Sequence, residues 1–110
     1  RNVHPAVAAY GALVERDAQR RHRVADYAKA LKLSPNHLNA LCRRHLGRGA
    51  KAVIADRLAL LARRSLLYSD RSTERIAFDL GFKDSSYFTR FVRRMSGRTP
   101  SQLRSDAATA

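Results

Sequence analysis

The sequence is poor in the residues that build disulfide scaffolds, zinc sites and long loops. Its 110 residues include one cysteine, three prolines, five glycines and no tryptophan. A single cysteine forms no internal disulfide and cannot supply a cysteine-rich zinc site, which excludes the class of small secreted disulfide scaffolds. Because no alternating strand pattern of useful length occurs either, the sequence predicts an all-α chain.

Long apolar runs are missing as well. No segment approaches the roughly 18–20 apolar residues that span a bilayer, and no signal-peptide pattern follows the first residue. We therefore expect a soluble, cytoplasmic protein with no membrane partner. The chain is too short for a barrel enzyme or a dinucleotide-binding enzyme with a substrate domain. It begins with Arg1 rather than Met, so we expect a fragment of a longer polypeptide.

Acidic residues are few, and the charge is strongly one-sided. Nine Asp and Glu residues face 22 Lys and Arg residues, 18 of them arginine, which gives a net charge of +13. Arginine suits phosphates and base edges, so nucleic acid is the favoured partner. The carboxylates lie apart and the four histidines lack zinc spacing. We therefore expect no enzyme activity, no metal and no cofactor.

Seven helices follow from the apolar periodicity and from the residues that start and stop helices. Each proline stands where a helix can begin, and Ser34 and Ser72 are predicted N-caps. The predicted helices run from about Pro5 to Ala18, Val24 to Leu31, Pro35 to Leu46, Ala50 to Ser69, Thr73 to Leu80, Ser85 to Met95, and onward from Pro100. The expected organisation is a first helix-turn-helix subdomain with its N-terminal helix over 1–49, a connecting helix over 50–70 and a second helix-turn-helix subdomain over 71–110.

An internal duplication underlies the two subdomains. LNALCRRHLGR (38–48) matches FTRFVRRMSGR (88–98) at an offset of 50, while Ala28 matches Ala77 at an offset of 49. The second copy therefore carries one extra residue in its turn. Each copy is a short helix, a tight turn and a longer helix, which is the helix-turn-helix outline.

The longer helix of each copy has two distinct faces. The residues predicted to point inward are Leu38, Leu41, Cys42 and His45 in the first copy and Phe88, Phe91, Val92 and Met95 in the second. The residues predicted to point outward are Asn36, Asn39, Ala40 and Arg43 in the first copy and Ser86, Thr89, Arg90 and Arg93 in the second. Asn and Arg fit adenine and guanine edges. A lone polar face is usually only solvated, but two at matching positions in this basic chain favour DNA.

At these residues the chain resembles the DNA-binding domain of AraC/XylS-type bacterial transcription regulators. The stretch ERIAFDLGFKDSSYFTRFVRRMSGRTPSQLR (74–104) is similar to the family signature, and SPNHLNALCRRHLG (34–47) and DRLALLARRSLLYSD (56–70) are similar to a reading helix and a connector. The resemblance covers about residues 24–104. Ala40 departs from the arginine of many members, and Thr73 replaces a larger aliphatic residue.

The resemblance implies two helix-turn-helix subdomains whose reading helices enter successive major grooves of one DNA face. The implied function is sequence-specific binding of double-stranded DNA by a bacterial transcription regulator, and the residues leave open whether it is an activator or a repressor. By position, the implied base-reading residues are Asn36, Asn39, Ala40, Ser85, Ser86, Thr89 and Arg90. Further implied partners are RNA polymerase and an N-terminal effector-binding or dimerisation domain that this sequence does not contain.

The remaining basic and polar residues have simpler interpretations. A cluster after the outward faces is predicted to contact DNA phosphates: Arg43, Arg44, Arg48, Lys51, Arg93, Arg94 and Arg98. Cys42 is predicted to be a small buried residue. Arg57 lies inside the apolar arc of the connecting helix, so its head either extends to solvent or is held by a carboxylate or a helix C-terminus.

Two alternatives use the same positive charge. A cationic helical module could coat anionic membranes, but the apolar faces here are needed for the cores of the two copies. RNA binding is the other alternative. Sequence-reading RNA modules usually expose stacking aromatics, whereas Phe88 and Phe91 are predicted to face inward.

Overall fold

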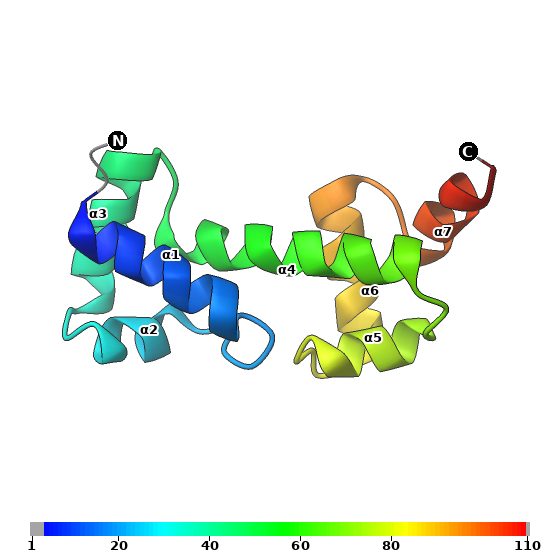
Figure 1. Ribbon diagram of the computed structural model, residues 1–110, viewed down its shortest axis with the longest axis horizontal. Coiled ribbons are helices and arrows are strands. Elements are labelled where there is room, and N and C mark those ends of the chain that lie inside the picture. Colours follow the sequence, from blue (N-terminus) through cyan, green and yellow to red (C-terminus); the bar gives the residue numbers. More distant parts are fainter. Residues whose placement is uncertain (1–3, 110) are drawn as a thin grey trace. The chain divides into compact units, whose positions relative to one another are not determined.

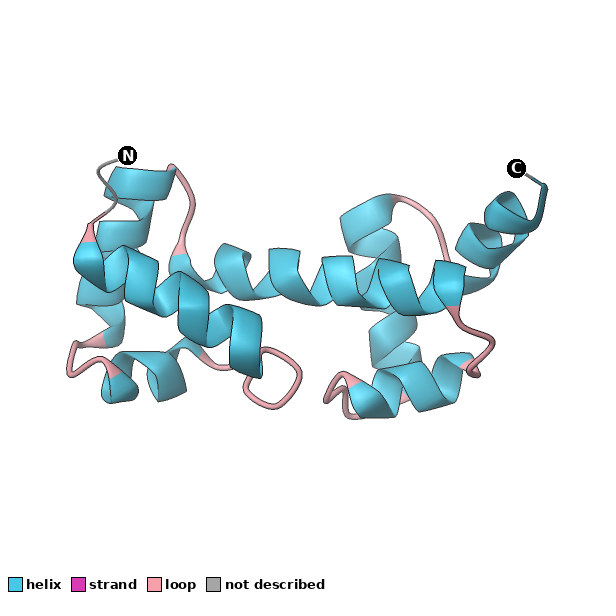
Figure 2. Ribbon diagram, in the orientation of Figure 1, coloured by secondary structure: helices cyan, strands magenta, loops and turns pink. Residues whose placement is uncertain are grey.

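The computed structural model describes residues 4–109, with the side chains described through residue 108. Within this range the chain forms seven α-helices and no strand (Figures 1 and 2). The helices are α1 (Pro5–Asp17), α2 (Val24–Ala30), α3 (Pro35–Leu46), α4 (Ala50–Tyr68), α5 (Thr73–Asp79), α6 (Ser85–Ser96) and α7 (Pro100–Thr109). The all-α prediction is confirmed, and the predicted boundaries agree to within one residue. None of the described helices is both long and apolar enough to cross a membrane.

The helices begin at the predicted signals. The three prolines each begin a helix: Pro5, Pro35 and Pro100. The Ser34 hydroxyl accepts a hydrogen bond from the His37 N–H at 3.0 Å, and the Ser72 hydroxyl accepts one from the Arg75 N–H at 3.0 Å. Both predicted N-caps are therefore confirmed, and each satisfies a backbone donor that the helix itself leaves unpaired.

Residues with left-handed backbone conformation occur at two places in each copy: directly after the longer helix, and in the turn that precedes it. Gly47 and Gly97 follow α3 and α6 with φ of 72° and 76°. In the turn before α6, Gly81 has φ of 82°, but the matching turn before α3 places Lys32 at φ of 60°. A side chain in this conformation costs roughly 1–2 kcal/mol, which glycine avoids.

The chain divides into two compact units between Arg57 and Leu58. In the N-terminal unit the core is built on two tyrosines, whose ring centroids lie 5.5 Å apart in an edge-on arrangement. The Tyr10 hydroxyl donates to the Ala50 carbonyl at 2.6 Å, and the Tyr27 hydroxyl donates to the Arg21 carbonyl at 2.7 Å. Burial raises the pKa of Tyr10 and that of Tyr27, so both hydroxyls remain neutral hydrogen-bond donors.

Of two residues predicted to lie on the inner side of α3, only one does. Cys42 is fully buried, as predicted, and burial raises the pKa of its thiol. The inward position predicted for His45 is wrong, because His45 is exposed and its ring lies 5.0 Å from that of His4. The last turn of α3 extends past the buried part of the helix, since Leu46 beside it is also exposed.

The C-terminal unit has a core of phenylalanines. Phe82 lies between α5 and α6, with its ring centroid 5.1 Å from that of Phe88 and 5.0 Å from that of Phe91. Phe88, Phe91 and Val92 are buried, as predicted for the inner side of α6, and Met95 is half-buried. These contacts fix the side of α6 that faces the core.

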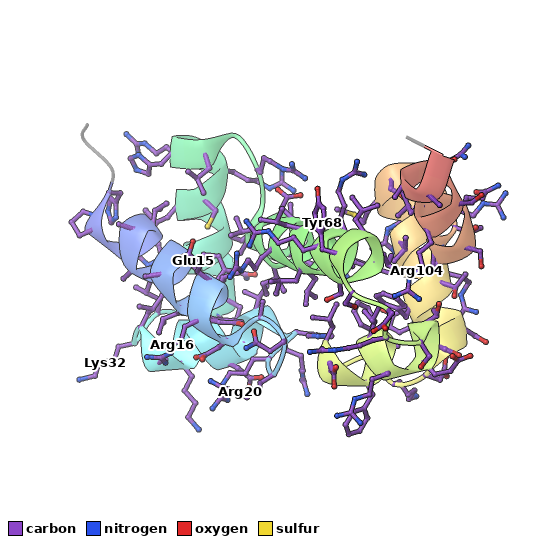
Figure 3. The ribbon with its side chains drawn as sticks, turned by 45° about the vertical axis from the view of Figure 1, so that its right-hand side comes forward. Glu15, Arg16, Arg20, Lys32, Tyr68 and Arg104 are labelled. Carbon is purple, nitrogen blue, oxygen red and sulfur yellow. The ribbon has the colours of Figure 1, made fainter. Side chains whose placement is uncertain are left out.

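In each unit an arginine donates hydrogen bonds to backbone carbonyls at the C-terminal end of a helix, α1 in the N-terminal unit and α4 in the C-terminal unit. In the N-terminal unit, Arg57 Nη2 donates to the Glu15 carbonyl in the last turn of α1 at 3.1 Å. This confirms the helix C-terminus as one of the alternatives for Arg57. In the C-terminal unit, Arg104 donates from Nε to the Leu66 carbonyl at 3.0 Å and from Nη2 to the Ser69 carbonyl at 3.1 Å (Figure 3). Cations at these positions also suit the negative end of the helix dipole.

Candidate nucleic-acid interface

The outward side of α6 presents the second set of predicted base-reading residues. Ser86 and Arg90 are exposed, while Ser85 and Thr89 are half-buried. The start of the helix is fixed because Asp84 Oδ1 accepts a hydrogen bond from the N–H of Tyr87 at 2.7 Å. With Phe88, Phe91 and Val92 buried on the other side, Ser86 and Arg90 are left on the solvent side of α6.

The outward side of α3 is less uniform. Asn36 and Ala40 are exposed, but Asn39 is half-buried and its Oδ1 accepts a hydrogen bond from the Ala50 N–H at 2.9 Å. That contact caps α4 from the side chain of another helix. It also explains Gly49, because a Cβ at that position would lie 2.7 Å from Asn39 Oδ1. One of the two Oδ1 lone pairs is thereby used within the protein, and the amide is held toward α4, so a bidentate pairing with adenine has to share this oxygen with the Ala50 N–H.

The seven predicted phosphate-contacting residues fall into three groups. Four of them are exposed and contact neither an acceptor nor a ring among the described residues: Arg43, Arg44, Lys51 and Arg93. Two are paired within their own unit, since Arg48 Nη1 lies 2.9 Å from Asp56 Oδ2 and Arg98 Nη2 lies 2.7 Å from Asp106 Oδ2. Arg94 lies with its guanidinium 5.5 Å from the centroid of the Phe91 ring.

A further basic group, Arg20, Arg21 and Arg23, lies in the loop between α1 and α2 and is exposed. One member is engaged, because Arg20 Nη2 donates to the nearly buried Asp17 carboxylate at 2.6 Å, beside Arg16 (Figure 3). The two hydrogen bonds from Arg16, followed by the one from Arg20, lower the pKa of Asp17 to about 2. Asp17 is therefore ionised at neutral pH and reduces the positive charge of this loop.

Sequence reasoning missed three functional or supporting side chains. Asp56 and Asp106 each stand eight residues after the arginine with which they pair, a spacing repeated in both copies and visible in the sequence. Tyr87 is exposed, and the guanidinium of Arg90 lies over its ring at 5.8 Å. The spacing of three residues on one helix could have indicated that contact.

The chemistry available at this surface is hydrogen bonding and charge attraction. Within each unit the candidate readers lie on one helix and the candidate phosphate contacts lie on or directly after it. No group of three or more His, Cys, Asp or Glu side chains in residues 4–109 is placed to hold a metal ion. Exposed hydroxyl, amide and guanidinium groups on a helix are the groups that proteins use to contact base edges and phosphates.

Comparison with known proteins assigns the chain to a type of regulator domain. A family model of the helix-turn-helix domain matches residues 27–106. The HTH-type transcriptional regulator ExsA of Pseudomonas aeruginosa is 34% identical over 82 residues, which are 74% of this chain and 30% of that protein. The HTH-type transcriptional regulator GlxA of Rhizobium meliloti is 32% identical over 101 residues, which are 92% of this chain and 31% of that protein. The chain thus spans about a third of the length of these relatives.

Solved structures share the fold at low identity. The C-terminal domain of AraT, a response regulator from Geobacillus stearothermophilus, matches with a TM-score of 0.91 at 20% identity, covering 96% of this chain and 88% of that one. The DNA-binding domain of AdpA, solved in complex with a target DNA, matches with a TM-score of 0.86 at 21% identity, covering 96% of each chain. An AraC-type transcriptional regulator from Chromobacterium violaceum matches with a TM-score of 0.84 at 22% identity, covering 94% of this chain and 93% of that one. These matches confirm the predicted fold of two helix-turn-helix subdomains.

Proposed function

This chain belongs to the AraC type of helix-turn-helix domain, and we propose on that premise that it is the DNA-binding part of a bacterial transcription regulator. It binds double-stranded DNA sequence-specifically, with α3 and α6 as reading helices in successive major grooves. The observation that carries the proposal is the duplication of one arrangement: in each unit a short helix and a tight turn precede a helix with a buried apolar side and an exposed polar side. Paired helices of this kind in a chain of net charge +13 suit a duplex.

The proposal assigns base contacts and phosphate contacts to different side chains. On α6, Arg90 reads a guanine and Ser86 and Thr89 contact neighbouring bases, with Ser85 at the start of the helix. On α3, Asn36 and the Asn39 amide donors contact bases, and Ala40 provides an apolar contact such as a thymine methyl group. The exposed, unpaired cations after the reading residues neutralise phosphates: Arg43, Arg44, Lys51 and Arg93. Arg48, Arg94 and Arg98 also contact phosphates once DNA replaces the contacts that they make within the protein, which are with Asp56, the Phe91 ring and Asp106.

The wider setting of this DNA-binding part is also a proposal. The chain covers about a third of its relatives, so an effector-binding or dimerisation domain would come from the rest of the polypeptide. One relative is named a transcriptional activator, RhrA of Rhizobium meliloti, 33% identical over 90 residues. By that analogy we assign the intact protein to activation, with RNA polymerase as a protein partner and the cytoplasm as its location.

The test is selection of bound sequences from random duplexes. We expect a motif with two half-elements about one helical turn, or roughly 10 base pairs, apart. Competition with single- and double-stranded RNA and flotation with vesicles of anionic lipid run beside it. No enriched motif, or retention on RNA or vesicles at affinities equal to the selected duplex, contradicts the proposal.

Two variants distinguish base recognition from phosphate contact. Arg90→Ala should cost about 1–3 kcal/mol on the selected duplex and relax the preference at one base pair. Arg93→Ala, at an exposed position one helical turn further on, should weaken selected and random duplexes equally. Electrophoretic or fluorescence titration of both duplexes measures the difference. Equal losses on both duplexes for Arg90→Ala would show that Arg90 does not read a base.

A further inference from the structure

The guanidinium of Arg90 lies over an aromatic ring that belongs to the same helix. Its Cζ is 5.8 Å from the centroid of the Tyr87 ring, three residues earlier on α6, and both side chains are exposed. No carboxylate or carbonyl in the described part of the chain accepts a hydrogen bond from Arg90. A guanidinium over a ring is attracted to the ring's π-face and still has its N–H donors for a ligand.

The Tyr87 ring itself is fixed to the core of the C-terminal unit. The Tyr87 N–H donates to Asp84 Oδ1 at 2.7 Å, and its ring meets Phe82 edge-on with centroids 5.9 Å apart. Phe82 is buried and contacts both Phe88 and Phe91. The ring is therefore a platform supported from both the backbone and the core.

The first copy lacks this arrangement, although its backbone is the same. At the offset of 50, Tyr87 and Arg90 correspond to His37 and Ala40. The His37 N–H donates to the N-cap Ser34 just as the Tyr87 N–H donates to Asp84. At these positions the two copies differ in their side chains, and α3 has neither the platform nor the arginine.

We propose that Tyr87 is a positioning residue for DNA reading: its ring holds the Arg90 guanidinium in place, which makes α6 the more discriminating of the two reading helices. This rests on the proposed function. A free arginine has many rotamers and loses that freedom when it binds a base, whereas an arginine already stacked on a fixed ring loses less. The contribution of Tyr87 therefore acts through Arg90 and at the base pair that Arg90 reads.

The experiment is a double-mutant cycle on the selected duplex and on duplexes with each base pair replaced. Tyr87→Leu should lower affinity for the selected duplex by about 2- to 5-fold, the size expected of an exposed cation–π contact. The preference should relax at the same base pair as in Arg90→Ala. In the Arg90→Ala background, Tyr87→Leu should have no further effect, and Tyr87→Phe, which keeps the ring, should bind like wild type.

The chain offers a matched control on a helix to which no reading role is assigned. On α5, Arg75 lies over the Phe78 ring at the same distance, 5.8 Å, and Phe78 is 74% exposed. Phe78→Leu removes a cation–π contact of the same length, although Arg75 also pairs with Asp79 at 3.1 Å, and should leave DNA affinity and preference unchanged. Circular dichroism and thermal unfolding check that Tyr87→Leu is folded, and Tyr87→Gln, a second ring-free variant of comparable helix propensity, gives the same comparison.

The outcomes separate this proposal from the proposed function. A wild-type chain without any preferred duplex overturns both. A wild-type preference combined with a Tyr87→Leu loss that persists in the Arg90→Ala background, or that appears at another base pair, overturns the positioning role alone. Equal losses in Tyr87→Phe and Tyr87→Leu would instead assign the effect to the hydroxyl. Ring-current shifts of the Arg90 side-chain protons, absent in Tyr87→Leu, are expected in the free wild-type protein, and their absence also overturns the positioning role.

Discussion

The two units join their reading helix to the next helix in different ways. In the N-terminal unit the junction depends on α3, because Asn39 Oδ1 accepts a hydrogen bond from the Ala50 N–H at 2.9 Å. In the C-terminal unit the cap is local: Thr99 Oγ1 accepts from the Gln102 N–H at 3.2 Å, and Gln102 Oε1 accepts from the Thr99 N–H at 2.9 Å. Pro100, which matches Ala50, has no N–H to satisfy.

This difference changes which side chains of each reading helix are available to contact a ligand. Thr89 matches Asn39 but has no capping role, so the outward side of α6 is free for a ligand while part of the outward side of α3 is occupied. What both units share is the backbone geometry, with Gly47 and Gly97 at φ of 72° and 76° after the reading helices. The two copies share the turns that end their reading helices and differ in the side chains around them.

The largest effect is expected from the matching core positions Leu38 and Phe88, both 0% exposed. Phe88→Ala should destabilise by about 3–5 kcal/mol and Leu38→Ala by about 2–5 kcal/mol, because each leaves a cavity in a packed core. We expect each change to act first on its own unit. Denaturant unfolding gives the size, and residue-level hydrogen exchange shows where protection is lost. Equal loss of protection in α1–α3 and in α5–α6 from Phe88→Ala would contradict the separation of the units.

The cap at the N-terminal junction is expected to have the next largest effect. Asn39→Ala should destabilise the protein by about 0.5–2 kcal/mol, since it removes an N-cap hydrogen bond and leaves the Ala50 N–H unpaired. Thr89→Ala, the matched change on α6, should cost less because no such bond is lost. Thermal unfolding compares the two. A larger loss for Thr89→Ala, or no loss for Asn39→Ala, would show that the junction does not depend on this contact.

Much of the fold could be predicted because its signals are local. Pro35 and Ser34 together predict the start of α3, and the spacing of Phe88, Phe91 and Val92 predicts the buried side of α6. The bond from Asn39 to Ala50 could not be predicted, because it depends on how two helices meet after an intervening turn.

Other misses have separate reasons. His45 is misplaced because periodicity does not show where the core ends along a helix. The left-handed φ of Lys32 is visible only in the alignment of the two copies, which places Lys32 on Gly81. For the candidate interface, residue types and faces were predictable, while the pairing of Arg48 and Arg98 required the structure.

Low pH should reduce the stability of the N-terminal unit, because it protonates Asp17. No carboxylate in the described part of the C-terminal unit is buried to the same extent. The folded pKa of Asp17, about 2, lies below the ordinary value of 3.8, so its contribution is present above pH 4 and is lost as the pH falls toward 2. Asp17→Asn should lower stability at neutral pH, with a smaller difference from wild type at pH 2. Urea unfolding at a series of pH values provides the check. A difference that is constant across this range would contradict the ionic role of Asp17.

The smallest effects on stability are expected from the ion pairs that the two units share. Arg48–Asp56 and Arg98–Asp106 are exposed, with side-chain exposures of 55% and 45% and of 46% and 54%, and such pairs contribute about 0–1 kcal/mol. Asp56→Asn and Asp106→Asn should therefore change unfolding little. Their effect on DNA should be larger, because each change releases an arginine that stands next to a predicted phosphate-contacting region.

A salt titration distinguishes the released arginines from a general gain of positive charge. If a freed Arg48 or Arg98 contacts one more phosphate, the slope of log affinity against log salt should steepen by about 0.9 for each variant. Asp26→Asn is the matched control: Asp26 is an exposed residue of α2 that pairs with no arginine in the described part of the chain. It should raise affinity slightly through net charge and leave the slope unchanged. Unchanged slopes in Asp56→Asn and Asp106→Asn would remove Arg48 and Arg98 from the phosphate contacts and leave them as supports of the turns that end α3 and α6.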